Sequence, residues 1–334
     1  MAPAAEGKGK LSPDALKLDL AAEAEFIAAK MREIVTQRLR RRGVVVAVSG
    51  GIDSALCLAL AAKAFGPQRT LALALPERES SAASLALGRK LAARFDVPLV
   101  VQDLTAALEG LGAYKLRDDA IRAVFPEFGP GWKSKIVIAG GSAGGFNHFK
   151  VVVELPGGEQ KEAPLPSKNY LDIVAAQNHK QRLRKTMDYH HADRLHYAVV
   201  GTPNRLEFDQ GFFVKNGDGA ADLKPIAHLF KTQVYAMAEH LGVPEEICRA
   251  RPTTDTYTLN QGQDEFYFAL PYEKMDLALY ALNNGYTAAA LAQAIGISEE
   301  AAANVFKDII AKRKMTQPLH AKTLLMRPVP EIEI

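Results

Sequence analysis

Six consecutive residues, SGGIDS at positions 49–54, place two hydroxyls, two glycines and one carboxylate at the end of a β-branched run. A glycine-rich turn between a strand and a helix exposes backbone N–H groups to an anion at the positive end of the helix. The carboxylate of Asp53 can hold a magnesium ion that bridges phosphate oxygens. The alternative is a tight turn whose glycines serve packing only. A strand before the loop and a helix after it favour a site for polyphosphate with Mg²⁺.

The loop differs from two common nucleotide-binding loops. No lysine follows the glycines, so the loop is not a P-loop of the Gly-x-x-x-x-Gly-Lys-Ser/Thr kind. It also lacks the Gly-x-Gly-x-x-Gly spacing of dehydrogenases, which removes the main sequence support for hydride transfer. The chemistry indicated is the binding and release of pyrophosphate.

The elements around this loop alternate between strand and helix. Residues 44–48 form a continuous β-branched run, which is typical of a strand buried on both faces. Further strands are predicted at residues 71–75, 99–102 and 196–200. Helices are predicted at residues 15–42, 54–65, 81–95, 231–241, 272–284, 287–294 and 299–312. This alternation predicts an α/β fold, a doubly wound parallel sheet flanked by helices.

One segment interrupts the alternation. Residues 127–166 are rich in Gly and Pro and contain two β-like runs, at 135–139 and 149–155. The Gly157-Gly158 pair then turns the chain back toward a third strand. We interpret the segment as a small β-rich insertion, which is either a flap over the main domain or a surface excursion with no role.

The composition restricts the class of protein. A chain of 334 residues with 48% hydrophobic and 24% charged residues is ordinary for a soluble globular protein. A net charge of +3 gives no support for a nucleic-acid partner, and no apolar run is long enough to span a bilayer. Two cysteines, Cys57 and Cys248, exclude a disulfide framework and have no metal-ligand spacing.

The N-terminus shows no targeting signal. Residues 1–13 are small and polar, and they lack a charged region followed by an apolar one. We therefore expect a disordered lead-in over residues 1–13, a single domain over residues 14–334 and a cytoplasmic location.

Several blocks carry a family resemblance. SGGIDS is similar to the Ser-Gly-Gly-x-Asp-Ser loop of the ATP pyrophosphatases, which cleave ATP to AMP and pyrophosphate while activating a carboxylate or carbonyl group. NHKQRLR, residues 178–184, resembles the Asn-x-Lys-Ala-Arg-x-Arg signature of the ammonia-dependent NAD synthetases. Residues 199–234 resemble that family's Val-Val-Gly-Thr-x-Asn-Lys-x-Glu and Gly-x-Phe-x-Lys-x-Gly-Asp-Gly blocks. Residues 251–276 resemble its Pro-Thr-Ala-Asp and Gln-x-Asp-Glu region.

This resemblance implies an adenine nucleotide alpha hydrolase-like fold and a reaction. Deamido-NAD, ATP and ammonia would give NAD, AMP and pyrophosphate. The nicotinate carboxylate would attack the α-phosphorus of ATP, and ammonia would then displace AMP from the acyl-adenylate. Catalysis would depend on positioning and charge stabilisation, with ATP as co-substrate and Mg²⁺ as cofactor.

The resemblance also implies roles for individual residues. The residues expected to bind ATP are Ser49, Gly50, Gly51, Ser54, Thr202, Lys231 and Thr253. The residues expected to contact the dinucleotide are Asn178, Arg182, Lys215, Asp222 and Lys312. Asp53 and Glu207 match the two metal carboxylates, and Asp53 and Lys215 are the candidate catalytic residues.

Three features depart from the family pattern. Ala311 stands where the family has a histidine beside Lys312, Lys185 stands where the family usually has Met, and the compact family members lack the insertion. One alternative is therefore a paralogue that adenylates and amidates another carboxylate. A third interpretation, a non-catalytic nucleotide-binding protein, is disfavoured by the presence of both Asp53 and Glu207.

The expected partners are small molecules. No glutaminase module accompanies the synthetase-like part, so ammonia is expected to arrive free or from a separate protein. Members of the family are usually homodimers with the substrate site at the interface. By analogy we expect a homodimer, with the N-terminal helix and the helix at residues 171–194 as candidate contacts.

Overall fold

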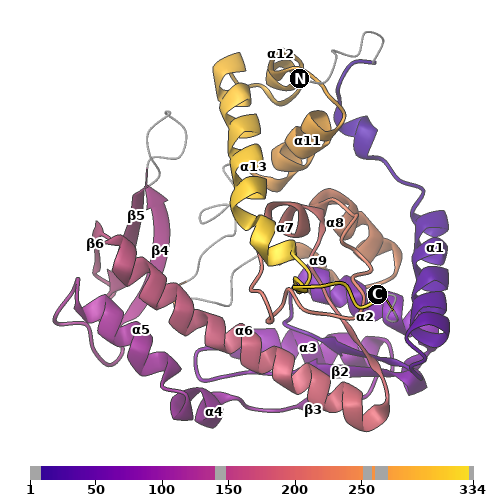
Figure 1. The fold of residues 1–334 in the computed structure, drawn as a ribbon, viewed down its shortest axis with the longest axis horizontal. Helices are drawn as coiled ribbons and strands as arrows, with labels where there is room; N and C mark the ends of the chain where they lie inside the picture. Colours follow the sequence, from indigo (N-terminus) through magenta and orange to yellow (C-terminus); the bar gives the residue numbers. More distant parts are fainter. Residues whose placement is uncertain (1–8, 140–147, 251–257, 260–269, 331–334) are drawn as a thin grey trace.

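Four parallel strands form the central sheet. The computed structural model describes residues 9–139, 148–250, 258–259 and 270–330. The strands are β1 (Val44–Ala47), β2 (Thr70–Ala74), β3 (Leu99–Val101) and β7 (Ala198–Val200), and their order is β3-β2-β1-β7 (Figure 1). β1 pairs in parallel with both β2 and β7, so that Val44 is aligned with Thr70 and with Ala198. The β-branched run therefore lies inside the sheet, as its sequence predicts.

Helices cover both faces of this sheet. Val44 and Val46 pack on one face, against α1 (Leu20–Arg32), α2 (Ile52–Phe65), α3 (Ala82–Arg94), α8 (Lys231–His240) and α9 (Glu245–Arg249). Val45 packs on the other face, against α4 (Thr105–Gly110), α5 (Ala113–Arg122) and α6 (Ser167–Leu195). Successive residues of a strand point to opposite faces, so one buried strand supplies both cores. The predicted doubly wound α/β fold is confirmed.

The predicted insertion, here called the flap, is an antiparallel sheet. The flap consists of β4 (Lys133–Ala139), β5 (His148–Glu154) and β6 (Gln160–Pro164), in the order β4-β5-β6. Its apolar face packs on α5 and α6 through Ile136, Val151 and Val153. Figure 1 shows the flap beside the start of α6, the longest helix of the described chain. The predicted β-rich insertion is thus a sheet of its own, built on two helices of the main fold.

The C-terminal helices form a separate apolar cluster. α11 (Tyr272–Asn283), α12 (Ala288–Ile295) and α13 (Glu299–His320) pack together, and Leu11 and Leu16 pack with them. Leu11 is 4% exposed, so the structure differs here from the disordered lead-in predicted over residues 1–13. A short 3₁₀ turn, η1 (Pro13–Leu16), follows Leu11 because Pro13 fixes the backbone of its first turn. Residues 1–8 lie outside the described chain.

Two predicted helices differ in extent. The helix predicted over residues 15–42 is interrupted before α1, because the Asp19 carboxylate accepts a hydrogen bond from the Ala22 N–H at 3.0 Å and so begins a new helix. α1 then passes into a π-helical turn, η2 (Glu33–Arg38). α13 runs past the predicted end at Lys312 to His320.

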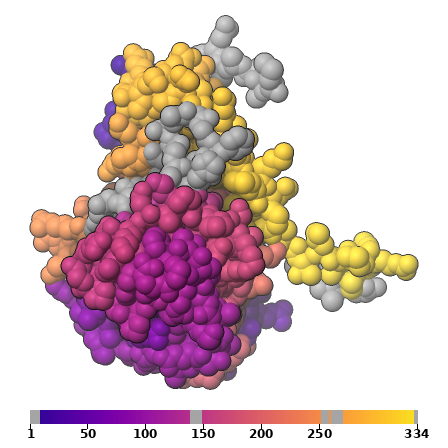
Figure 2. Space-filling view, turned by 90° about the vertical axis from the view of Figure 1, so that its left-hand side faces the viewer, coloured from indigo at the N-terminus to yellow at the C-terminus, as the bar shows by residue number. Residues whose placement is uncertain are grey.

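The chain after α13 extends away from the body. Residues 321–330 are all exposed, and Figure 2 shows this segment projecting from the molecule. No described helix has the combination of length and apolarity needed to cross a bilayer.

Candidate active site

The SGGIDS loop connects the carboxyl end of β1 to α2. Gly50 has a φ of +82°, and a Cβ at this position would lie 2.8 Å from the carbonyl oxygen of Ser84, so both backbone conformation and space require glycine. The Ser54 hydroxyl donates to the Gly51 carbonyl at 2.9 Å and accepts from the Ser49 N–H at 3.2 Å. Among the described residues no side chain caps α2, so the N–H groups of its first turn are open to an anion.

The Asp53 carboxylate lies between a cation and an amide. One oxygen forms an ion pair with Lys231 Nζ, and the other accepts from Asn204 Nδ2 at 3.0 Å. Lys231 is the first residue of α8 and is only 1% exposed. Burial disfavours the charged amine, but the Asp53 and Glu207 carboxylates outweigh burial and raise the pKa of Lys231. A permanently charged lysine therefore lies beside the loop.

Glu207 is the second carboxylate of this centre. It lies on α7 (Arg205–Gln210), where Asn204 and Glu207 form a capping box: the Asn204 side chain accepts from the Glu207 N–H at 3.2 Å, and the Glu207 carboxylate accepts from the Asn204 N–H at 3.1 Å. Removal from water raises the pKa of Glu207 to about 8, and the nearby Asp53 carboxylate adds to the rise. Asn204 thus positions both carboxylates.

This pair of carboxylates fits a magnesium ion that arrives with a nucleotide. Within the described ranges no group of three or more His, Cys, Asp and Glu residues could hold a metal by itself. Mg²⁺ in nucleotide sites usually takes one or two carboxylates and completes its shell with phosphate oxygens and water. Burial and the neighbouring Asp53 carboxylate together raise the pKa of Glu207 more than Lys231 lowers it, so a negative charge on Glu207 is unfavourable without a further cation. A divalent cation would balance it.

Most of the predicted site residues line one cavity. It has a volume of about 840 Å³ and opens at the carboxyl ends of β1, β2 and β7. The predicted residues that line it are Ser49, Gly50, Gly51, Asp53, Ser54, Asn178, Arg182, Thr202, Glu207, Lys215, Lys231 and Lys312. Lys215 Nζ donates to the carbonyl of Pro318 at 2.8 Å, and Lys312 forms an ion pair with Asp308 at 2.7 Å.

Two further positions from the sequence analysis, Asp222 and Ala311, are described but are not part of the cavity wall, and a third is not described. Asp222 is not among the described residues that line the cavity, because its carboxylate accepts from the Val199 N–H at 2.7 Å along the outer edge of β7. Its second oxygen accepts from the Tyr189 hydroxyl at 3.4 Å. Thr253 lies outside the described residues. Ala311 is exposed on α13 and does not belong to the described cavity wall.

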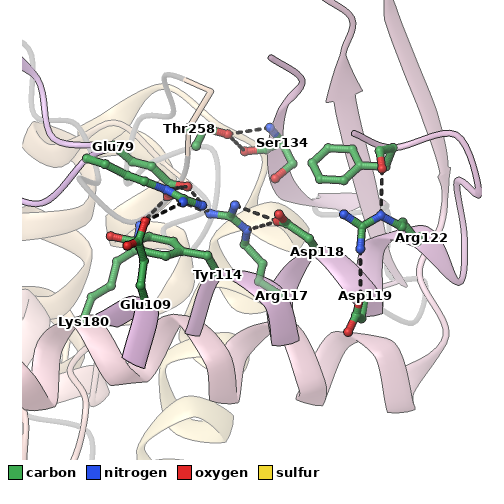
Figure 3. Close-up of polar contacts among 12 residues, drawn as sticks. Glu79, Glu109, Tyr114, Arg117, Asp118, Asp119, Arg122, Ser134, Lys180 and Thr258 are labelled. Atoms are coloured by element: carbon green, nitrogen blue, oxygen red, sulfur yellow. Dashed lines mark hydrogen bonds and ion pairs between the residues drawn. The ribbon is translucent and has the colours of Figure 1, made fainter. Parts of the chain in front are cut away.

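A buried ionic network fixes the loop that follows β2. Lys180 on α6 is 3% exposed and forms ion pairs with Glu77 at 3.0 Å and Glu79 at 2.6 Å. Arg117 on α5 also contacts Glu79 at 2.6 Å, and the Tyr114 hydroxyl donates to Glu77 at 2.7 Å. Figure 3 shows Lys180, Arg117 and Tyr114 converging on this loop. The following residues of the loop, Ser80 and Ser81, line the cavity.

Sequence reasoning missed two kinds of residue at this site. Asn204 could have been found, because Asn-x-x-Glu before a short helix is a capping-box pattern. Phe149 of β5 and Tyr170 of α6 also line the cavity, yet no local pattern indicates that their rings meet. Their contact depends on how the flap is placed against α6.

Comparison with known sequences identifies relatives along nearly the whole chain. The model of the NAD synthase family matches residues 23–123 and 159–318. A protein from Rhizobium rhizogenes named NH3-dependent NAD+ synthetase is 53% identical over 320 residues, which are 96% of this chain and 96% of the relative. A protein of the same name from Thermotoga maritima is 36% identical over 260 residues, 77% of this chain and 84% of the relative.

Solved structures share the fold at low sequence identity. The structure of an NMN synthetase from Francisella tularensis has a TM-score of 0.63 and 21% identity, covering 92% of this chain and 99% of that chain. An NH3-dependent NAD synthetase from Campylobacter jejuni has a TM-score of 0.61 and 18% identity, and the match covers 93% of this chain and 100% of that chain. The family model spans more than half of the chain, and the sequence relatives extend that match to nearly its full length. The chain therefore belongs to the NAD synthase family.

Proposed function

We propose that this chain is an ammonia-dependent, AMP-forming ligase that converts deamido-NAD to NAD. The observation that carries the proposal is the open N-terminus of α2, which lies beside the Asp53–Lys231 pair and Glu207. The chain is also 53% identical to a protein named for this activity. The geometry suits a reaction that expels pyrophosphate, because backbone donors, a buried ammonium and two carboxylates meet where charge develops on the leaving group.

In the first step the nicotinate carboxylate attacks the α-phosphorus of ATP, and the bond to pyrophosphate breaks. The N–H groups of residues 50–54 and the hydroxyls of Ser49 and Ser54 bind the departing pyrophosphate. Lys231 balances its charge from the floor of the cavity. Asp53 and Glu207 would hold Mg²⁺, which when bound lowers the charge repulsion among the phosphate oxygens.

In the second step ammonia attacks the acyl carbon, and AMP leaves with the former carboxylate oxygen. Asn178 and Arg182 on α6 line the same cavity as Lys215 and Lys312, and Arg182 Nε donates to the Lys215 carbonyl at 3.3 Å. One amide and three cationic side chains are therefore available to the substrate. Arginine can bind a pyrophosphate with two hydrogen bonds, while lysine acts as a point charge. Positioning of the acyl-adenylate in this cleft, and not a protein nucleophile, drives the amidation.

The activity is tested by product stoichiometry. The purified chain is incubated with ATP, Mg²⁺, ammonium and deamido-NAD, and NAD and AMP are quantified by chromatography. We expect equal amounts of both, with neither NAD nor sustained AMP release when ammonium is omitted. A parallel panel replaces deamido-NAD by other carboxylates. Ammonia-dependent AMP release with another acid but not with deamido-NAD would contradict the proposal and identify a paralogue.

We further propose that the chain is a homodimer, and that it works in the cytoplasm, as the sequence analysis predicts. Two helices expected at the interface each carry a large exposed apolar side chain, Phe26 on α1 at 54% exposure and Leu171 on α6 at 62%. The position of Asp222 outside the cavity also fits a substrate site that two subunits complete. Light scattering after gel filtration should give twice the chain mass, and Leu171→Glu should lower it.

A further inference from the structure

An aromatic pair forms the flap end of the cavity wall. Phe149 of β5 and Tyr170 of α6 stack with their ring centroids 4.0 Å apart and their planes 15° from parallel. Both side chains are only partly buried, and both line the cavity that holds the SGGIDS loop. Within the described chain the Tyr170 hydroxyl has no hydrogen-bond partner. The pair therefore presents a planar apolar surface and a free hydroxyl to whatever occupies the cavity.

The pair belongs to a part of the chain that the shared family pattern omits. The NAD synthase model passes from residue 123 to residue 159, so it leaves out β4 and β5 with Phe149. The flap nevertheless touches the common fold by packing on α5 and α6 and through the Ser134 N–H, which donates to the Thr258 hydroxyl at 2.7 Å (Figure 3). The flap is thus held in a fixed place beside the site.

α6 sets the distance between the aromatic pair and the reaction centre. Arg184 Nε donates to the carbonyl of Leu75 at 3.3 Å, which places Arg184 level with the carboxyl edge of the sheet. Tyr170 precedes Arg184 by 14 residues of the same helix, a rise of about 21 Å. The cavity therefore extends well beyond the SGGIDS loop and ends at the flap.

The side chains along this face of α6 change from apolar to basic. From the flap toward the sheet, the residues that line the cavity are Tyr170, Val174, Gln177, Asn178, Gln181, Arg182, Arg184, Lys185 and Asp188. Lys185 and Asp188 form an ion pair with each other at 2.8 Å, so Arg182 and Arg184 supply the positive charge of this end. Gln177 is 4% exposed, and its Nε2 has no acceptor within the described chain. An aromatic end, an amide-rich middle and a basic end match the order base, ribose and pyrophosphate of a nucleotide.

We propose that the Phe149–Tyr170 pair binds the adenine ring of deamido-NAD; this inference rests on the proposed function. The nicotinate carboxylate must reach the α-phosphorus of ATP beside Asp53 and Lys231, so the opposite end of the dinucleotide lies away from the sheet edge. The flap end of the cavity offers that end an aromatic surface for stacking. The insertion therefore adds a binding site for the adenosine half of the substrate to the common fold.

Substitution of Phe149 tests the proposal because it should raise KM for deamido-NAD and leave KM for ATP unchanged. Loss of one base–aromatic stack costs about 1–3 kcal/mol, or roughly 5- to 150-fold in affinity. We expect Phe149→Ala to raise KM for deamido-NAD by at least about fivefold, with KM for ATP and kcat within about twofold of wild type. Phe149→Leu keeps an apolar side chain for packing of the flap and should show most of the same increase.

Trp132→Leu is the matched control inside the flap. Trp132 packs edge-on against Phe128, with centroids 5.8 Å apart, and is not part of the described cavity wall. The Trp132→Leu substitution should lower Tm and leave KM for deamido-NAD unchanged. If Trp132→Leu raised KM as much as Phe149→Ala does, the flap would act only as a support and the proposal would be wrong.

Substrate fragments identify which half of the dinucleotide the pair binds. ADP-ribose carries the adenosine end, and nicotinate mononucleotide carries the other end. In Phe149→Ala the inhibition constant of ADP-ribose should rise by the same factor as KM, while that of nicotinate mononucleotide should not change. The reverse pattern, or a rise in KM for ATP, would overturn the assignment. Failure of the wild-type protein to make NAD would instead refute the proposed function.

Discussion

Asp53 is the residue on which the contacts of the site converge. Its carboxylate forms an ion pair with Lys231 and accepts from Asn204, and Glu207 lies close enough for the two negative charges to influence each other. Under the proposed function, a phosphate group that enters with its cation would compete for Lys231 and leave Asp53 to the metal. The same carboxylate thus keeps the lysine in place in the free enzyme and would bind Mg²⁺ in the loaded one.

We expect Asp53→Asn to lower kcat by about 10²- to 10³-fold, the usual effect of removing one electrostatic contact to a developing charge. AMP release measures the change, and Tm shows whether the fold is kept. Glu246→Gln is the control, because Glu246 forms an exposed ion pair with Lys90 and should change neither quantity. Wild-type rates of AMP release in Asp53→Asn would remove this carboxylate from the mechanism.

Gly50 offers a test of backbone geometry. Its φ of +82° and the Ser84 carbonyl 2.8 Å from a hypothetical Cβ both oppose any side chain. Gly158 in the flap turn has a φ of +87° with no atom within 4 Å of its hypothetical Cβ. We expect both Gly→Ala variants to lose about 1–2 kcal/mol from the left-handed backbone. Only Gly50→Ala should also lose more than about tenfold in kcat/KM for ATP. Equal values of kcat/KM for ATP in Gly50→Ala and Gly158→Ala would show that the SGGIDS loop can shift without loss of activity.

At the scale of elements, α6 connects the flap, the cavity and the buried ionic network. Lys180 is the centre of that network, and we expect Lys180→Met to lower the free energy of unfolding by about 3 kcal/mol. Glu77 would stay buried without its cation, while Arg117 would still pair with Glu79. Urea unfolding measures the loss. Lys168→Met, which breaks an exposed pair with Asp172 on the same helix, should cost less than about 0.5 kcal/mol. Similar losses would mean that burial adds nothing to the Lys180 pair.

The first turn of α8 carries a titrating cap. The Asp276 carboxylate accepts from the N–H groups of Lys231 at 3.2 Å and Thr232 at 2.8 Å. Burial raises the pKa of Asp276 to about 6, although both donors favour the ionised form. The folded state therefore binds this proton more tightly than the unfolded chain, so the contribution of Asp276 to stability falls as pH rises from about 4 to about 6.

Asp276→Asn should remove that slope while keeping an oxygen that caps the helix. Relative to wild type, the variant should gain on the order of 2 kcal/mol of unfolding free energy between about pH 4 and pH 7. Urea titrations at each pH give the unfolding free energy of both proteins. The contributions of the other titrating groups are the same in both and cancel when the two free energies are subtracted. Parallel profiles would contradict the raised pKa.

The elements also show which features the sequence could predict. Residues 44–48, the glycine pair and the strand-helix alternation are local signals, and the fold follows them. The break before α1 was missed because a single side-chain contact of Asp19 competes with helix continuation. Phe149 and Tyr170 were missed for another reason: they are 21 positions apart and meet only through the register of β5 and the packing of the flap.

At the scale of the whole molecule, the beginning of the chain stabilises its end. Leu11 lies in the apolar cluster of α11, α12 and α13. We expect Leu11→Ala to cost about 2 kcal/mol, because it removes a buried side chain and leaves a cavity. Leu324→Ala, at a side chain 79% exposed in the C-terminal segment, should cost nothing measurable in the same melting experiment. An unchanged Tm for Leu11→Ala would mean that this segment packs too weakly to matter.

The edge of the central sheet has a consequence for self-association. β7 is an outer strand, and unpaired outer strands invite pairing with the strands of other molecules. Here Val199 has both backbone groups engaged: its N–H donates to the Asp222 carboxylate and its carbonyl accepts from the Asp222 N–H at 2.9 Å. The three-residue strand thus ends the sheet with a charge and a filled hydrogen-bonding edge. Asp222, whatever its part in binding, also protects the protein against edge-to-edge aggregation.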